Sequence, residues 1–320
     1  MAHEITYANG KHEMAYVGEK PWHGLGQELK DGASIDEWKV AAGMNWKAQR
    51  ATVRYATERN DGGMQVWPDQ HVLFRSDTKA PLGLVSDSFQ IVQPGQVLEF
   101  FRDLVEAAGF KLITAGTLKG GRKFWAQADI GAQAAIVGKD VVKQRILLAT
   151  AVDGSMNTIA KNVSERVVCA NTLAIAMGEA GAPMVRVSHR SKFNEAAVKQ
   201  QLGVAVPSFL QFVAQAREMA KAPMLVPKQF LNTLLGEEEV KVEDKSAGWN
   251  KILALFNGEG RGANLPGVKG TAWGMLNAVT EYVDHHVRAR SVDNRMDSAW
   301  FGMGDRLKND ARDKLVALVS

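Results

Sequence analysis

Residues 110–130, FKLITAGTLKGGRKFWAQADI, contain two stretches with the period-two alternation of β-strands on either side of a glycine-rich turn. A third stretch of this kind, VVKQRILLATAV, follows at residues 141–152. Because short turns join consecutive strands into hairpins, these residues predict an antiparallel β-meander. The first turn and the position after it carry three cations and lead directly into two aromatic residues, Phe124 and Trp125.

Alternation divides the side chains of KFWAQADI, residues 123–130, between two faces of the predicted sheet. Phe124 begins a set with alanines and an isoleucine, which suits a core face. The opposite face carries Lys123 and Trp125 among polar residues. An indole beside an ammonium group on a solvated face suits stacking on a nucleobase next to a phosphate contact. The alternative is that Trp125 packs under a neighbouring loop, because large aromatic residues are mostly buried.

Cations recur on other predicted strands of this region. Alternation places Lys143 with Arg145, and Arg186 with Arg190, on single faces of their strands. We expect a basic sheet surface that follows a phosphate backbone without reading base edges; a solvated sheet face is the alternative. The residues expected to contact DNA are Lys119, Arg122, Lys123, Trp125, Lys143, Arg145, Lys161, Arg166, Arg186, Arg190 and Lys192.

The charge distribution supports this expectation. The chain of 320 residues has a formal net charge of only +4, but residues 111–200 hold 13 Lys and Arg against 6 Asp and Glu, a net charge of +7. No run approaches the roughly 18 apolar residues of a membrane span, so we expect a soluble, cytoplasmic protein without a membrane partner. Cys169 is the only cysteine, which excludes an intramolecular disulfide and a cysteine-rich zinc site.

The rest of the pattern predicts an α+β fold, in which helices pack an antiparallel meander and a mostly helical C-terminal region follows. A hairpin is expected over residues 50–76, with its turn at RNDGG. Ser34 and Glu37 form a predicted capping box, and Pro94 and Gly109 bound the most regular amphipathic pattern. The helices before the C-terminal region are predicted at residues 34–43, 94–109, 164–181 and 194–221, the last bent or broken by Pro207.

Enzyme signals are weak, and we predict no catalytic residues, no cofactor and no metal. The sequence has no HExxH, no GxSxG and no P-loop. Cys169 has apolar neighbours, which favours a structural thiol, and the pair His285–His286 has no recognised metal spacing. The glycine-rich segment 258–274 is interpreted as a surface loop, with phosphate binding by its backbone N–H groups as the alternative.

Three motifs carry a resemblance that covers nearly the whole chain: PWHGLG at 21–26, RVVCANTL at 166–173 and GTAWGMLNAVTEYVDH at 270–285. Together they resemble an uncharacterised family called phage/plasmid-like proteins. The order of hairpin, strands, helix, meander and helix also resembles the core of single-strand annealing recombinases, the RecT, Erf and Redβ kind. That second resemblance implies rings or helical filaments that hold single-stranded DNA in a basic groove and anneal it without ATP.

The leading hypothesis is therefore a phage or plasmid protein that binds single-stranded DNA and anneals strands during homologous recombination, without ATP. Residues 1–50 are interpreted as an arm with a short helix, 51–235 as an annealase-like α+β core, and 236–320 as a helical region. The predicted partners are single-stranded DNA, further copies in a ring or filament, and a host single-strand-binding protein. The alternative is a non-enzymatic anti-defence factor that binds a host protein. Phe100 or Phe101, and helix 194–221, are interpreted either as subunit contacts or as core.

Overall fold

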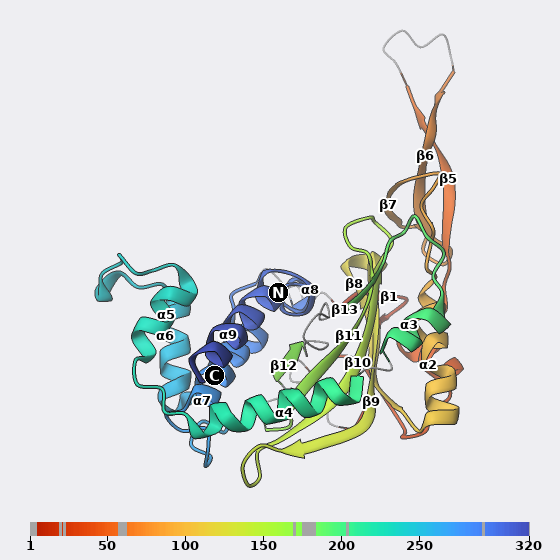
Figure 1. Cartoon of the computed structure of the whole chain (residues 1–320). Coiled ribbons are helices and arrows are strands. Elements are labelled where there is room, and N and C mark those ends of the chain that lie inside the picture. The colour runs from red at the N-terminus through yellow and green to blue at the C-terminus, as the bar shows by residue number, and fades with distance from the viewer. Residues whose placement is uncertain are drawn as a thin grey trace.

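The computed structural model shows an α+β fold, as predicted, with a mixed sheet between helical layers (Figure 1). It describes residues 5–18, 21, 24–56, 63–168, 171–174, 184–202, 205–289 and 292–319. Of the three motifs that carry the resemblance, Trp22, His23, Cys169 and Ala170 lie outside these ranges. Within the described residues, no helix is both long and apolar enough to cross a membrane.

The central sheet contains eight strands among the described residues, in the order β12-β11-β10-β9-β8-β3-β4, with β13 also paired to β11. Every neighbouring pair is antiparallel except β3 and β4. The consecutive strands β8, β9 and β10 confirm the predicted meander. The strands of this sheet are β3 (Met14–Val17), β4 (Gln27–Leu29), β8 (Lys111–Leu118), β9 (Lys123–Ala135), β10 (Val141–Ala151), β11 (Thr158–Arg166), β12 (Asn171–Ala174) and β13 (Met184–Val187).

The turn between β8 and β9 needs its glycines for conformation and for space. Lys119, Gly120 and Gly121 all have positive φ angles, of 54°, 71° and 89°, a region that glycine enters without strain. A Cβ atom on Gly121 would lie 2.9 Å from the Trp46 ring and 3.0 Å from the Arg75 guanidinium. Close packing of the turn therefore explains Gly121 without any ligand.

A second sheet projects from the body as an extended β-ribbon (Figure 1). It consists of β5 (Ala48–Tyr55), β6 (Gln65–Arg75) and β7 (Pro81–Ser86), so the predicted hairpin is confirmed. The turn of the hairpin, at residues 57–62, lies outside the described residues. A short ladder of β1 (Tyr7–Ala8) and β2 (Lys11–His12) precedes β3.

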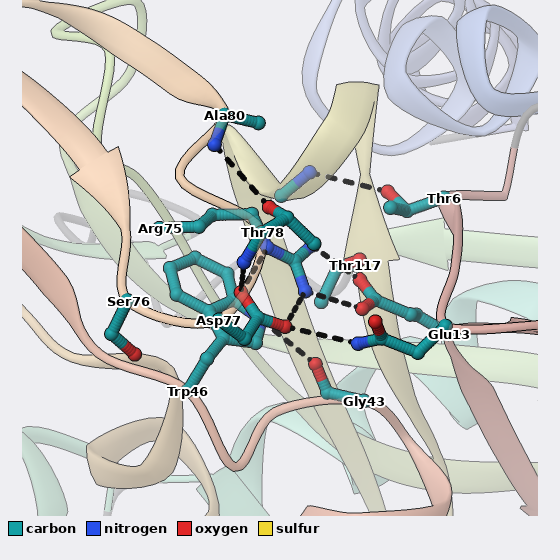
Figure 2. Close-up of polar contacts among 12 residues, drawn as sticks. Thr6, Glu13, Gly43, Trp46, Arg75, Ser76, Asp77, Thr78, Ala80 and Thr117 are labelled. Carbon is teal, nitrogen blue, oxygen red and sulfur yellow. Dashed lines mark hydrogen bonds and ion pairs between the residues drawn. The ribbon is translucent and has the colours of Figure 1, made fainter.

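A buried ion cluster joins the ribbon, the N-terminal segment and the central sheet (Figure 2). Arg75 donates to both carboxylate oxygens of Glu13, at 2.8 and 2.5 Å, and to Asp77 at 3.0 and 2.8 Å. The Arg75 guanidinium lies 4.4 Å from the centre of the Trp46 ring, and the Thr117 hydroxyl donates to Glu13 at 2.6 Å. Because its charges are paired and fully hydrogen-bonded, the cluster fixes the base of the ribbon against the body.

Three helices cover one face of the central sheet: α1 (Ile35–Ala41), α2 (Pro94–Ala108) and α3 (Glu195–Leu202). Ser34 and Glu37 close the predicted capping box of α1, and Gly109 ends α2 in the left-handed conformation. Phe100 and Phe101 both have 0% exposed surface, so they form core and neither is available as a subunit contact.

The C-terminal helices form a separate core on the other side of the sheet (Figure 1). The predicted helix 194–221 is divided into α3 and α4, and residues 203–204 lie outside the described residues. Asn194 accepts from the backbone of Ala197, as expected of an N-cap. The helices of this region are α4 (Ala205–Lys221), α5 (Pro227–Leu235), α6 (Ala247–Ala254), α7 (Ala272–Glu281), α8 (Val292–Phe301) and α9 (Met303–Val319).

The predicted helix at 164–181 is wrong where the structure describes it. Ser164 and Arg166 pair with Gln144 and Val142 of β10, so this segment continues the meander as β11. An apolar run with adjacent valines fits either a helix or a strand. The unpaired edge of β10 offers backbone hydrogen-bond partners, and this favours the strand.

Candidate nucleic-acid interface

One face of the central sheet carries most of the residues predicted to bind DNA. Cross-strand pairing of Trp125 with Ala149, and of Leu147 with Lys161, places their side chains on the same face. Phe124 lies in the core with α2 on the opposite face, as predicted. We call the first face the lysine face and define it by Lys119 of the adjoining turn and by Thr114, Lys123, Trp125, Arg145 and Lys161.

The lysine face is covered by protein instead of facing solvent. Trp125 is 1% exposed and meets Trp300 of α8 edge-on, with ring centroids 5.7 Å apart. Gly116 lies beside the indole, where a Cβ atom would approach the Trp125 ring to 2.7 Å. The expectation of a solvated indole is therefore wrong, and the packing alternative is correct. The covering element is a helix from the distant C-terminal region, which strand alternation could not indicate.

Carboxylates of α8 and α9 pair with the lysines of this face. Asp297 accepts hydrogen bonds from both Lys119 and Lys123, and Lys161 donates to Asp305 at 3.0 Å and to the Trp300 carbonyl at 2.5 Å. Burial alone would raise the pKa of Asp297, but the two lysine hydrogen bonds outweigh it and hold that pKa below its usual value. Burial lowers the pKa of Lys161, although Asp305 opposes this.

Two further predicted DNA contacts are occupied by neighbouring groups. Arg145 pairs with Glu165 on the adjacent strand. Arg166 pairs with Asp140 at 2.6 Å and donates to the carbonyls of Arg261 and Gly262 at 3.1 and 3.3 Å. The buried cations Lys123, Arg145, Lys161 and Arg166 are therefore inaccessible to DNA in this conformation, because each is paired with a carboxylate inside the protein.

Other predicted cations do reach the surface at one end of the sheet, and Lys143 is half-buried at the other end. Arg186 pairs across the strands with Ile159, whose side chain lies in the core under the lysine face. Alternation places Arg186 on that same face, beside its covered part. We call the accessible cations at this end the basic rim, which consists of Arg122, Arg186, Arg190 and Lys192.

The base of the ribbon lies against the basic rim. Arg50 of β5 donates to the carbonyls of Asp87 and Phe89, and the Phe89 ring stacks on His189 with a centroid distance of 4.4 Å. His189 immediately precedes Arg190, so these contacts connect the base of the ribbon to the segment that carries Arg190 of the rim.

Sequence reasoning missed the aromatic residues of the ribbon. Tyr55 and Trp67 are 47% and 54% exposed, and the exposed Arg54 lies on the opposite face of the ribbon. Tyr55 is paired with Gln65, and Trp67 follows two residues later, so alternation places both aromatic rings on one face of the ribbon. The aromatic residues on both strands next to the predicted turn were the signal that could have identified this surface.

The part of the chain that the structure describes holds no cluster of metal-ligating side chains. There, no group of three or more His, Cys, Asp or Glu side chains lies close enough to hold a metal ion. Asp284 pairs with Lys308 at 2.8 Å. In the glycine-rich segment 258–274, the carbonyls of Arg261 and Gly262 accept from Arg166, and the Arg261 N–H donates to the Glu281 carboxylate at 2.9 Å, so these groups are occupied within the protein.

Residues 81–300 match a protein family described as a domain of unknown function, DUF932. This match covers more than half of the chain, and the chain belongs to that family. No curated protein and no solved structure matches the chain. The family description agrees with the phage/plasmid-like resemblance, since neither states an activity.

Proposed function

We propose that this protein binds single-stranded DNA through the basic rim and the ribbon and anneals complementary strands without ATP. In this proposal it is a phage or plasmid protein of homologous recombination that acts in the cytoplasm of a bacterial host. The observation that carries the proposal is the gathering of accessible cations at one end of the sheet, next to the base of a projecting ribbon that carries two exposed aromatic rings toward its far end.

The chemistry of the two surfaces suits a single strand. Arg190 and Lys192 can neutralise backbone phosphates in a sequence-independent way. Tyr55 and Trp67 offer π-faces on which unpaired bases can stack. Duplex DNA hides its base faces within the stack, so exposed aromatic rings favour single-stranded over double-stranded DNA.

Annealing needs no covalent chemistry, only charge neutralisation and bases that stay accessible to a second strand. Several copies acting along one strand would hold it extended, so we include a homo-oligomer, as a ring or a filament, in the proposal. The C-terminal helices have their own core, which leaves them available for a host single-strand-binding protein.

The exposed apolar residues of the ribbon favour a second candidate, a non-enzymatic factor that binds a host protein. Exposed apolar side chains on both faces of a projecting ribbon offer a surface that a protein partner could cover. The apolar residues concerned are Tyr55, Met64, Val66, Trp67 and Leu84.

The direct test is binding of fluorescent oligo-dT over a range of salt concentrations. We expect Arg190→Ala with Lys192→Ala to weaken binding at low salt and to reduce the slope of log K against log salt by about 1.4, at about 0.7 per lost contact. The control, Lys228→Ala with Lys241→Ala, removes two exposed charges from the C-terminal region and should leave the slope unchanged. Absence of salt-dependent binding by the unmodified protein would exclude the DNA proposal and favour the protein-binding candidate.

A further inference from the structure

We propose that α8 and the start of α9, residues 292–305, form an acidic lid over the lysine face, and that single-stranded DNA displaces this lid. The lysine face is then a second, concealed DNA-binding surface next to the basic rim. This inference rests on the proposed function and concerns how the same site is regulated.

The lid presents anionic groups where DNA would present phosphates. Asp297 is a single carboxylate that accepts from two ammonium groups, Lys119 and Lys123, and a backbone phosphate between two lysines would do the same. Asp305 similarly neutralises Lys161. The two carboxylates therefore neutralise the lysines of the face in the way that the phosphates of a polyanion would.

Unpaired polar atoms on the lysine face supply an independent observation. Among the described residues, the buried side-chain atoms without a hydrogen-bond partner include Thr114 Oγ1, Trp125 Nε1 and Arg145 Nε. Strand pairing places all three on the lysine face. Each of these groups can donate a hydrogen bond, and native proteins rarely bury donors without acceptors. Phosphate oxygens and base carbonyls are acceptors that would satisfy them once the lid has moved.

The lid also makes a favourable edge-on aromatic contact with the face beneath it, which a nucleobase would have to replace. Trp300 meets Trp125 at an interplanar angle of 75°, which leaves the indoles edge-on instead of stacked. A nucleobase that replaced Trp300 could lie parallel to the Trp125 ring and gain the stacking contact.

The lid stays closed in the free protein because opening it exposes apolar side chains. Met296, Trp300 and Phe301 pack in the core beneath the lid and would meet water. DNA shifts this equilibrium only because it binds the open state more tightly. Arg122 lies in the same turn as Lys119. Single-stranded DNA bound at Arg122 would therefore compete directly with Asp297 for Lys119.

The experiment compares oligo-dT affinity between Asp297→Asn and Asp313→Asn. Both substitutions remove one negative charge, but the exposed Asp313 pairs with its neighbour Arg312 and not with the lysine face. We expect Asp297→Asn to tighten binding about fivefold or more, because a weaker lid raises the fraction of competent molecules, while Asp313→Asn changes affinity less than about twofold. Equal affinities for both variants and for the unmodified protein would overturn the lid and leave the proposed function standing. No binding by any of the three would overturn both.

Hydrogen exchange on the unmodified protein tests whether DNA opens the lid, without relying on the variants. Saturating oligo-dT should raise the exchange rate of backbone amides in α8 and leave α2, on the opposite face of the sheet, unchanged. Unchanged or slower exchange in α8 when the oligonucleotide is bound would show that the lid stays closed, and would contradict the inference even if Asp297→Asn failed to fold.

Discussion

The Trp125 indole on the central sheet lies edge-on against the Trp300 indole of α8, with ring centroids 5.7 Å apart. These residues are 175 positions apart in the sequence, and their contact closes a sheet face that otherwise carries lysines. The contact therefore lies where α8 covers Lys119 and Lys123, whose ammonium groups pair with Asp297 of the same helix.

Trp125→Ala tests the structural role of this contact. Because the indole is almost fully buried, we expect its removal to lower the free energy of unfolding by about 3–5 kcal/mol, as for other large buried aromatic residues. Urea denaturation followed by circular dichroism measures the loss. Unchanged stability would show that the lid does not pack on Trp125 in solution.

Trp67→Ala tests the exposed ribbon. We expect the free energy of unfolding to change by no more than about 0.5 kcal/mol, since the ring is more than half exposed. The free energy of oligo-dT binding should weaken by about 1–3 kcal/mol if the ring stacks on a base. Unaltered affinity would remove the ribbon from the DNA site and favour a protein partner.

Arg122→Ala and Lys123→Ala separate the accessible from the covered part of the same turn. Arg122 is exposed, so its loss should weaken DNA binding and leave the melting temperature unchanged. Lys123 is buried and paired with Asp297, so Lys123→Ala should lower the melting temperature. Thermal denaturation of both variants, with oligo-dT titrations alongside, distinguishes the two roles; identical behaviour would contradict the assignment.

The buried Arg75 cluster predicts a defined dependence of stability on acid. Hydrogen bonds from Arg75 lower the pKa of Asp77 to about 2, from an ordinary value of 3.8. A carboxylate whose pKa is lowered in the folded state stabilises the protein at any pH above the pKa that the group has in the unfolded state. This contribution is lost as pH falls from about 4 toward 2. We expect Asp77→Asn to flatten the fall in melting temperature over this range. A profile as steep as that of the unmodified protein would show that Asp77 does not carry the effect.

Local patterns predicted much of the fold because the residues responsible act on near neighbours. The capping box of Ser34 and Glu37, the boundaries of α2 and the orientation of Phe124 toward the core all follow from spacing within one element. In the 194–221 stretch, a bend or break at Pro207 was predicted, but Pro207 lies in the first turn of α4, a position where proline is tolerated, and α3 ends before it.

The candidate site was less predictable because its accessibility depends on distant residues. Strand alternation correctly placed Lys123 and Trp125 on one face, but nothing in those positions indicates that Asp297 and Trp300 cover them. The same limit explains the mistaken helix around Ser164, whose strand partner is Gln144 of β10. Partner choice between segments is a tertiary property that the alternation of a single strand does not contain.

The most direct test of the proposed function is an annealing reaction between two complementary oligonucleotides that carry a donor and an acceptor fluorophore. In the absence of ATP, we expect the protein to raise the annealing rate well above the spontaneous rate, and Arg190→Ala with Lys192→Ala to remove most of that acceleration. An annealing rate equal to the spontaneous rate, under low-salt conditions in which the protein is folded, would contradict the proposal.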